Sequence, residues 1–215
     1  MLEMSRIFVF IGSVGAGKST QIKLLSTFLG EQKIKTKSAT IKTRFPLTRM
    51  SSKLLCKIGV KHLSFKLKKA LVQVDLCLNL FLLPVLSLYV RILKRLGFLL
   101  LIEEYLPGIL VDYYHLAKIY KFKANLISIA MSILYKSLLL SGMSTILFVC
   151  DKTRLPERWK NRGTGPEYAD YLESQQTIFG ILEETASPFY HISTDVSVNL
   201  TFHNLVSAVT GQNYA

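Results

Sequence analysis

The sequence predicts an α/β fold, a three-layer sandwich in which a parallel β-sheet is covered by helices on both faces. Short apolar runs alternate along the chain with longer segments whose apolar residues recur at helical spacing. Half of the 215 residues are hydrophobic, which is enough to bury a core and unlike a disordered chain. No internal repeat or low-complexity linker divides the sequence, so we predict a single domain over residues 1–215.

The N-terminal part supplies two predicted strands and two predicted helices. RIFVFI (6–11) is a short apolar run that ends at a glycine, which is typical of a buried strand. Residues 18–29 have apolar side chains at helical spacing and a glycine after them, so they predict a helix. KTKSATIK (35–42) predicts the second strand, followed by a loop around Phe45–Pro46. A helix is expected at 50–71, with lysines four residues apart on one face.

The most apolar part of the chain is VDLCLNLFLLPVLSLYV, residues 74–90. It predicts a helix over 76–96, in which Pro84 marks a start or a kink. Polar residues and the proline interrupt it, so it falls short of the roughly 20 apolar residues that span a bilayer. We therefore expect a buried or half-buried core helix and no transmembrane span, with a membrane-facing or partner-facing helix as the alternative.

The C-terminal part continues the alternation of strands and helices. GFLLLIEEY (97–105) is a continuous apolar run that ends in two acids, which predicts a central parallel strand with the acids at its C-terminal edge. STILFVCD (144–151) is another apolar run and predicts a second buried strand. The other expected elements are helices at 111–120 and 124–140, a short helix within 155–163, a helix at 168–184, a strand at 188–194 and a helix at 199–209.

GSVGAGKS (12–19) is a phosphate-binding motif, G-x-x-x-x-G-K-S, placed between a predicted strand and a predicted helix. Its glycines allow a tight turn whose N–H groups point at phosphate oxygens, and the helix presents its positive end to the same anion. Lys18 is placed to reach the β- and γ-phosphates, and the Ser19 hydroxyl to ligate Mg²⁺. We expect ATP to be held by Gly12, Ser13, Val14, Gly15, Ala16, Gly17, Lys18, Ser19 and Thr20.

An acid at the end of a buried strand is the usual partner of such a loop in metal binding. Glu103 in LLLIEEY occupies this position, so we expect it to hold Mg²⁺ through water beside Ser19. Many strands end in acids, and the adjacent Glu104 could simply be solvated.

Two arginines precede a glycine-rich, charged loop. Arg158 and Arg162 lie four residues apart, on one face of a predicted helix. They suit a mobile lid, over about 152–168, that closes on the transferring phosphoryl group and neutralises its charge. The alternative is a surface pair supported by Glu157 or Glu167, worth only a few tenths of a kcal/mol.

The charge of the chain is strongly positive, with 27 Lys and Arg against 14 Asp and Glu, a net charge of +13. The segment 32–69 contains no acid and many lysines. Such a segment attracts anions, so nucleic acid or an anionic membrane surface is a candidate partner. The alternative is a solvated basic face.

The cysteines indicate the compartment. Cys56, Cys77 and Cys150 are odd in number, far apart, and without metal-binding spacing. Neither a disulfide framework nor a signal peptide is expected, so we predict a reducing, cytoplasmic setting.

Together these motifs resemble thymidylate kinase and its wider group of nucleoside and nucleoside-monophosphate kinases, over about residues 6–209. GSVGAGKSTQ resembles the family's phosphate loop, and TRFP (43–46) resembles the turn after its second strand. LLLIEEY lies where the family has Asp-Arg-Tyr, and LPERWKNRG with EYADYLESQQTIF resembles its lid and the next helix.

The resemblance implies a P-loop NTPase fold, a possible homodimer, and ATP- and Mg²⁺-dependent phosphoryl transfer to a nucleoside monophosphate, most simply dTMP. It also implies site roles. Lys18, Arg158 and Arg162 would be catalytic, Arg44 and Phe45 would lie at the acceptor site with Phe45 against the base, and Glu104 and Tyr105 would line the acceptor pocket.

Three departures from the family concern the acceptor half. Val14 replaces an acid that bonds the acceptor sugar, Glu104 replaces an arginine on the acceptor phosphate, and LCLNLFLL (76–83) lacks the family's arginine. A carboxylate facing a phosphate dianion would repel it. Three functions are therefore possible. The first is a nucleoside monophosphate kinase, and the second is a deoxynucleoside kinase in which Glu104 acts as a base toward a sugar hydroxyl. The third is a nucleotide-binding protein without kinase activity that docks on nucleic acid, a membrane or a partner through its basic segment.

Overall fold

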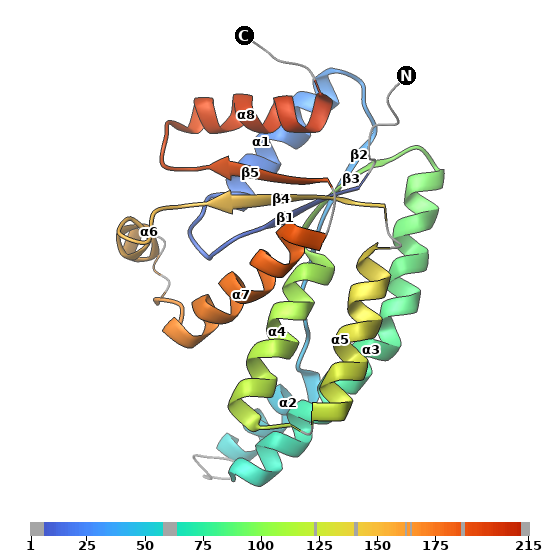
Figure 1. The fold of residues 1–215 in the computed structure, drawn as a ribbon, viewed down its shortest axis with the longest axis vertical. Coiled ribbons are helices and arrows are strands. Elements are labelled where there is room, and N and C mark those ends of the chain that lie inside the picture. The colour runs from blue at the N-terminus through green and yellow to red at the C-terminus, as the bar shows by residue number, and fades with distance from the viewer. Residues whose placement is uncertain are drawn as a thin grey trace.

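The fold was analysed in a computed structural model, which describes residues 7–57, 64–122, 124–139, 142–161, 163, 165–185 and 188–211. Within these ranges, five strands form one sheet in the order β2-β3-β1-β4-β5, and every neighbouring pair is parallel (Figure 1). The predicted fold class is confirmed. The strands are β1 (Ile7–Ile11), β2 (Thr36–Ile41), β3 (Leu99–Glu104), β4 (Ser144–Val149) and β5 (Phe189–Ser193).

Helices cover both faces of the sheet. On β1, Ile7, Val9 and Ile11 face one helical layer and Phe8 and Phe10 the other, because side chains alternate along a strand. One layer contains α3, α4, α5 and α7, and the other contains α1 and α8. The helices are α1 (Lys18–Glu31), α2 (Pro46–Lys57), α3 (Phe65–Arg95), α4 (Tyr105–Tyr120), α5 (Ala124–Leu139), α6 (Leu155–Asn161), α7 (Ala169–Thr185) and α8 (Val198–Thr210).

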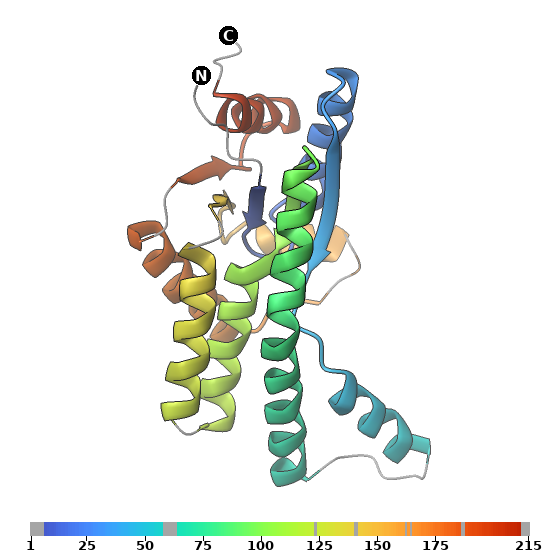
Figure 2. The same ribbon diagram turned by 90° about the vertical axis from the view of Figure 1, so that its right-hand side faces the viewer.

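The predicted helix at 50–71 is wrong. The chain forms two helices there, α2 and α3, and Ser64 caps the second by accepting a hydrogen bond from the backbone N–H of Leu67. α2 begins at Pro46, a residue suited to the first helical position because it has no N–H to leave unpaired. α3 then continues through Pro84, so this proline does not start a helix. Together α2 and the N-terminal part of α3 extend away from the sheet (Figure 2).

α3 is half-buried. Val72, Leu76, Leu83 and Val90 pack into the core, while the opposite side of the helix stays exposed and apolar. Of the helices that the structure describes, α3 alone is long and apolar enough to cross a membrane, and 17% of its most apolar stretch is buried. Length and composition by themselves do not show a span.

A buried carboxylate attaches α2 to α3. Asp75 of α3 is fully buried and accepts hydrogen bonds from the backbone N–H groups of Leu47 (3.0 Å) and Thr48 (2.9 Å) and from the Thr48 hydroxyl (2.7 Å). One turn later, Asn79 bonds both the N–H and the carbonyl of Arg44. The polar residues that interrupt the apolar helix therefore hold the turn after β2 in place.

Asp75→Ala is expected to lower the free energy of unfolding by about 3 kcal/mol, because it leaves buried donors at the start of α2 without an acceptor. Urea unfolding followed by circular dichroism measures the change. Glu184→Ala, at an exposed position on α7, is the control and should change stability by less than about 0.5 kcal/mol. A loss below about 1 kcal/mol for Asp75→Ala would show that this carboxylate does not hold α2.

Candidate nucleotide-binding and acceptor site

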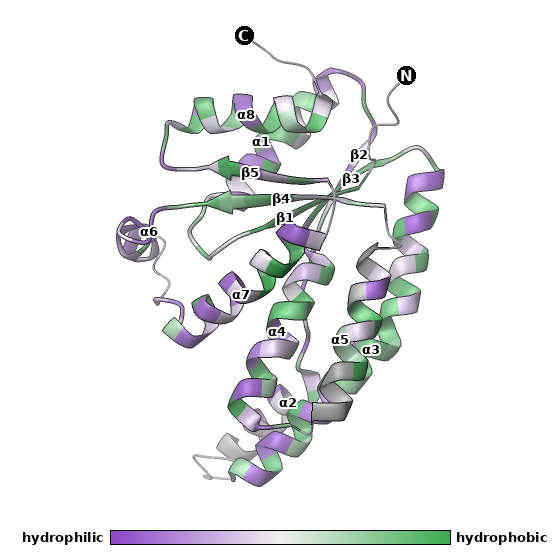
Figure 3. Ribbon diagram, viewed as in Figure 1, coloured by the Kyte–Doolittle hydropathy of each residue, from purple (hydrophilic) through white to green (hydrophobic). Residues whose placement is uncertain are grey.

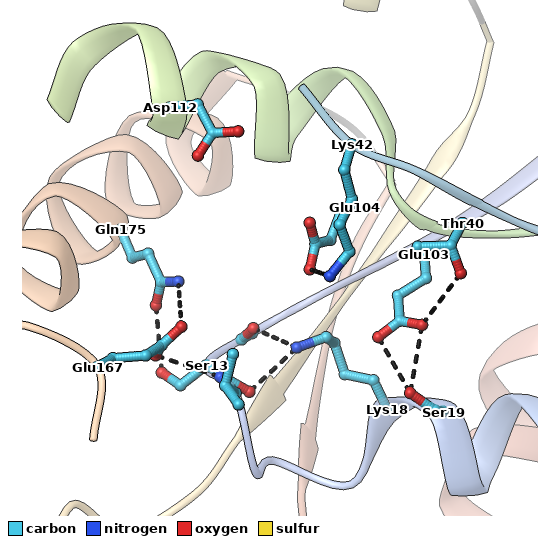
Figure 4. Close-up of polar contacts among 12 residues, drawn as sticks. Ser13, Lys18, Ser19, Thr40, Lys42, Glu103, Glu104, Asp112, Glu167 and Gln175 are labelled. Atoms are coloured by element: carbon cyan, nitrogen blue, oxygen red, sulfur yellow. Dashed lines mark hydrogen bonds and ion pairs between the residues drawn. The ribbon is translucent and has the colours of Figure 1, made fainter. Parts of the chain in front are cut away.

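The site lies at the C-terminal edge of the sheet, where the ends of β1, β2 and β3 meet. This edge is where parallel α/β sheets bind ligands. The phosphate loop connects β1 to α1, and Lys42 and Thr43 follow β2. Glu103 and Glu104 end β3, and Figure 4 shows them beside Lys18, Ser19 and Lys42.

The phosphate loop has the backbone shape that its glycines predict. Gly12 has a φ of 136°, and a Cβ atom there would lie 2.5 Å from the carbonyl oxygen of Phe148 on β4, so only glycine fits. Gly17 is left-handed, with a φ of 85°, and lies at the N-terminus of α1. The positive end of α1 therefore faces the loop, as anion binding requires.

Lys18 is buried across the mouth of the loop. Its Nζ donates hydrogen bonds to the carbonyl oxygens of Gly12 (2.5 Å) and Ser13 (3.0 Å). Burial lowers the pKa of Lys18, and the nearby carboxylates of Glu104, Glu103 and Glu167 act in the opposite direction. The lysine is thus held close to the phosphate position by groups that a bound phosphate can replace.

The predicted metal residues are close together. The Ser19 hydroxyl lies 3.2 Å from each carboxylate oxygen of Glu103, and the Thr40 hydroxyl lies 3.4 Å from Glu103 Oε2. This all-oxygen set fits Mg²⁺, which takes one or two protein ligands and completes its shell with water and phosphate. Among the described residues no cluster of three or more His, Cys, Asp and Glu forms a cage of its own.

A cavity of about 190 Å³ lies beside the loop and contains more acids than the sequence indicated. Lys42 and Glu104 form an ion pair across 2.8 Å. Asp112 and Glu167 also line the cavity, and burial raises the pKa of both carboxyls. Burial alone would lower the pKa of Lys42, but the hydrogen bond to Glu104 and the negative charges of Glu104, Glu103 and Asp112 together outweigh burial and raise it.

The backbone is strained where β3 meets α4. Glu104 has φ 75° and ψ −68°, and Tyr105 has a φ of 45°, values that non-glycine residues adopt at a cost of about 1–3 kcal/mol each. A Cβ atom on Gly108 would lie 2.8 Å from the Cβ of Glu104, so glycine is required there. The junction directs Glu104 into the cavity, while Tyr105 lies in a separate groove between α3 and α5, beside Ser87 and Arg91.

Glu167 attaches the segment after α6 to the phosphate loop. Its Oε2 accepts a hydrogen bond from the Val14 N–H (3.2 Å), and its Oε1 lies 3.5 Å from Gln175 Nε2. Gln175 in turn accepts a hydrogen bond from the Ser13 hydroxyl. Val14 itself brings no acid to the loop, but Glu167 places a carboxylate against it from a distant part of the chain.

Three other predicted residues, Arg44, Phe45 and Arg158, do not line the cavity. Arg158 donates to the carbonyl oxygen of Thr194 (2.6 Å), to the Thr194 hydroxyl (3.1 Å) and to the carbonyl of Gly15 (3.4 Å), so it joins α6 to the residue that follows β5 and to the phosphate loop. Trp159 supports this attachment by donating to the Val14 carbonyl. Arg162 lies outside the described residues. The backbone of Arg44 is bonded to Asn79, and Phe45 is partly buried against the hydrophobic core.

Among the comparisons with known proteins, a match was found only with solved structures. No protein-family model and no curated protein matches the sequence. A solved structure of thymidylate kinase from Candida albicans superposes with a TM-score of 0.52 and 18% sequence identity, over 99% of this chain and 94% of that chain. The protein has a thymidylate kinase-like fold. At this identity the likeness shows the fold alone, and the fold agrees with the P-loop NTPase class predicted from the motifs.

Within the thymidylate kinase-like fold, sequence reasoning missed part of the cavity lining. Lys42 directly follows β2, so the rule that ligands bind at the C-terminal ends of parallel strands could have found it. Asp112 on α4 and Tyr171 on α7 meet through a 2.9 Å hydrogen bond from the tyrosine hydroxyl. No local motif marks either residue, because only the packing of α4 against α7 brings them together.

Replacing both Ser19 and Glu103 by alanine is expected to weaken binding of a non-hydrolysable ATP analogue by about 10- to 100-fold when Mg²⁺ is present. In EDTA the same variant should bind the analogue nearly as the wild type does, because the loop and Lys18 are unchanged. Isothermal titration calorimetry under both conditions measures this. Ser26→Ala on α1 is the control, and equal weakening with and without Mg²⁺ would contradict the metal assignment.

Proposed function

We propose that this protein is an ATP- and Mg²⁺-dependent kinase of the nucleotide kinase class, with dTMP as the simplest acceptor. One observation carries the proposal. Lys18, Ser19 and Glu103 converge at the mouth of a phosphate loop, and a polar cavity opens directly beside them. The thymidylate kinase-like fold and the family resemblance of the motifs support the choice of acceptor.

The mechanism relies on positioning and charge neutralisation, without a covalent intermediate. The N–H groups of the loop and the N-terminus of α1 would bind the donor phosphates. Lys18 would move from the carbonyl oxygens of Gly12 and Ser13 to the β- and γ-phosphates. Ser19 and Glu103 would hold Mg²⁺, which neutralises charge on the transferring group when bound. Arg158 and Trp159 keep the loop in shape through their bonds to its backbone.

A second candidate acceptor is a neutral hydroxyl, as on a nucleoside sugar. The cavity favours it, because Glu104, Asp112 and Glu167 all line the space where an acceptor would lie. A phosphate dianion there would be repelled by Glu104, whereas a hydroxyl could donate its proton to that carboxylate. Lys42 would then hold Glu104 in place through their ion pair.

Coupled ADP release with dTMP, dUMP, other monophosphates and nucleosides tests the proposal. We expect release that depends on dTMP and is lost in Lys18→Ala. Release with nucleosides alone would favour the second candidate. No acceptor-dependent release, with ATP binding intact, would contradict both and favour a nucleotide-binding protein without kinase activity.

Glu104→Gln separates the two acceptors. If the acceptor is a monophosphate, removing the negative charge is expected to lower KM for it several-fold, because about 1 kcal/mol of repulsion disappears. If the acceptor is a neutral hydroxyl, kcat is expected to fall by about 10²- to 10⁴-fold with the loss of the base. Glu184→Gln, exposed on α7, is the matched control. No change in either constant would show that Glu104 does not face the acceptor.

Gly108→Ala is expected to reduce kcat/KM for the acceptor by about 100-fold. Its new Cβ atom would clash with Glu104 and displace that side chain, and a displacement of about 1 Å is enough to misalign a catalytic group. Binding of the ATP analogue should stay within about twofold of wild type, since the phosphate loop is untouched. Gly180→Ala on α7, where an added Cβ meets nothing within 4 Å, is the control. Equal activity of the two variants would contradict the role assigned to the β3–α4 junction.

A further inference from the structure

The ends of β2 and β3 bring two opposite charges together in the cavity. In the parallel pairing of these strands Ile41 lies opposite Glu104, and Lys42 directly follows Ile41. The strand β1 and the first part of β3 are hydrophobic (Figure 3), so charge begins only where β3 ends. There Lys42 Nζ and Glu104 Oε1 lie 2.8 Å apart, and both residues line the cavity. The ion pair therefore lies in the space where the proposed function puts an acceptor.

Stability alone does not account for this ion pair. The side chain of Lys42 is 53% exposed, and an ion pair that water reaches contributes little to stability. Glu104 joins the pair from a backbone with a φ of 75°, which is costly for a residue other than glycine, and Gly108 leaves the room that Glu104 needs. A strained residue held in a weak ion pair beside a phosphate loop indicates a functional contact.

Lys42 has donors left for a ligand. Among the described residues that line the cavity it is the only cation, against the carboxylates of Glu104, Asp112 and Glu167. Its ammonium group carries three N–H donors, and within the described part of the chain it forms an ion pair with Glu104 alone. Burial acts against its charge, but the hydrogen bond to Glu104 and the nearby carboxylates raise its pKa, so it stays charged at neutral pH. Lys42 is thus the cation in this cavity that can attract an anionic ligand.

Glu104 acts on two lysines at once. Besides its ion pair with Lys42, it influences Lys18 at the mouth of the phosphate loop. Burial lowers the pKa of Lys18, and Glu104 is the strongest of the carboxylates that oppose this effect. Figure 4 shows the Lys42–Glu104 pair on the same side of the loop as the Lys18 ammonium group. A phosphate group suits the same place, because carboxylate and phosphate oxygens both accept charge-assisted hydrogen bonds from lysine.

We propose that the Glu104 carboxylate marks the place of the acceptor's phosphate, and that Lys42 exchanges Glu104 for that phosphate when the acceptor binds. The exchange rests on the proposed kinase function, because it requires an acceptor in this cavity. Rotation about the side-chain bonds of Glu104 is enough to release Lys42, so β2 and β3 keep their positions.

The exchange selects among acceptors. A nucleoside monophosphate carries an anionic group that competes with Glu104 for Lys42, and it gains a charge-assisted hydrogen bond in return. A nucleoside has no anionic group, so it leaves the ion pair intact. Lys42 would therefore recognise a phosphate-bearing acceptor, while Glu104 sets how strongly a phosphate must compete.

Equilibrium binding to Lys42→Met tests the role of the lysine. Isothermal titration calorimetry of the full chain, with Mg²⁺ and a non-hydrolysable ATP analogue, compares dTMP, dCMP and AMP with their nucleosides. The variant is expected to bind the preferred monophosphate about 10- to 100-fold more weakly, because a charge-assisted hydrogen bond is lost. Binding of the matching nucleoside and of the ATP analogue should stay within about twofold of wild type. Lys42→Arg keeps the charge, so it should retain monophosphate binding within about fivefold.

Glu104→Gln tests the exchange itself. A neutral amide competes less for Lys42, so the variant is expected to bind the monophosphate several-fold more tightly and the nucleoside within about twofold of wild type. The matched control is the exposed ion pair between Lys118 and Glu173, whose charged atoms lie 2.7 Å apart and which does not line the cavity. Lys118→Met and Glu173→Gln should bind every ligand as the wild type does.

Three results would overturn the exchange. The first is equal weakening of monophosphate and nucleoside in Lys42→Met, which would make Lys42 a structural residue. The second is a wild type that binds none of the monophosphates more tightly than its nucleoside. The third is a loss of ATP-analogue binding in Lys42→Met with acceptor binding unchanged, which would assign the lysine to the donor.

The exchange and the kinase function can fail separately, because calorimetry requires no turnover. Monophosphate binding that depends on Lys42 without ADP release would contradict the kinase function and leave the exchange standing. Turnover of a monophosphate whose binding is unchanged in Lys42→Met would support the kinase function and overturn the exchange.

Discussion

The burial of one cation, Lys18, at the C-terminal edge of the sheet is the constraint on which the site depends. Its ammonium group has lost most of its water, and the Gly12 and Ser13 carbonyls with the carboxylates of Glu103, Glu104 and Glu167 compensate for that loss. These carboxylates come from the end of β3 and from the segment before α7, so the parallel sheet and the packing of α7 are both needed to assemble them. A nucleotide triphosphate would supply the same compensation through its phosphate oxygens, so the buried lysine suits the phosphate binding that we propose.

The proposed acceptor side of the site is built differently from the proposed donor side. The proposed donor side uses backbone groups and short polar side chains whose positions the loop dictates. The proposed acceptor side depends on a strained junction, where Glu104 is turned into the cavity and paired with Lys42, and where Gly108 leaves the space that this requires. A protein keeps such strain when the surrounding fold enforces it, and it is commonly found where a side chain has a function. The strain therefore indicates that Glu104 is held in place for a role of its own, and is not merely a replacement for the arginine that the resembled family has at this position.

Sequence reasoning predicted the sheet, the phosphate loop and the pairing of Ser19 with Glu103, because these follow from local patterns and from the rule that parallel strands share an edge. It failed where the cause was tertiary. The positive φ values at Glu104 and Tyr105, which start α4 six residues before the predicted helix, have no sequence signature of their own. Glu167 was considered only as a surface partner for the lid arginines. The exposed side of α3 could not be predicted, because apolar residues occur on every side of this helix and their periodicity does not distinguish the buried side from the exposed one.

A crystal structure of the protein with Mg²⁺, a non-hydrolysable ATP analogue and dTMP tests the central claim most directly, that the loop and the adjoining cavity form one phosphoryl-transfer site. We expect Lys18 Nζ to have left the Gly12 and Ser13 carbonyls for the β- and γ-phosphates, Mg²⁺ to lie against the Ser19 hydroxyl, and the acceptor to lie in the cavity beside Glu104 and Lys42. A triphosphate bound away from the loop, or an acceptor bound outside that cavity, would contradict the claim.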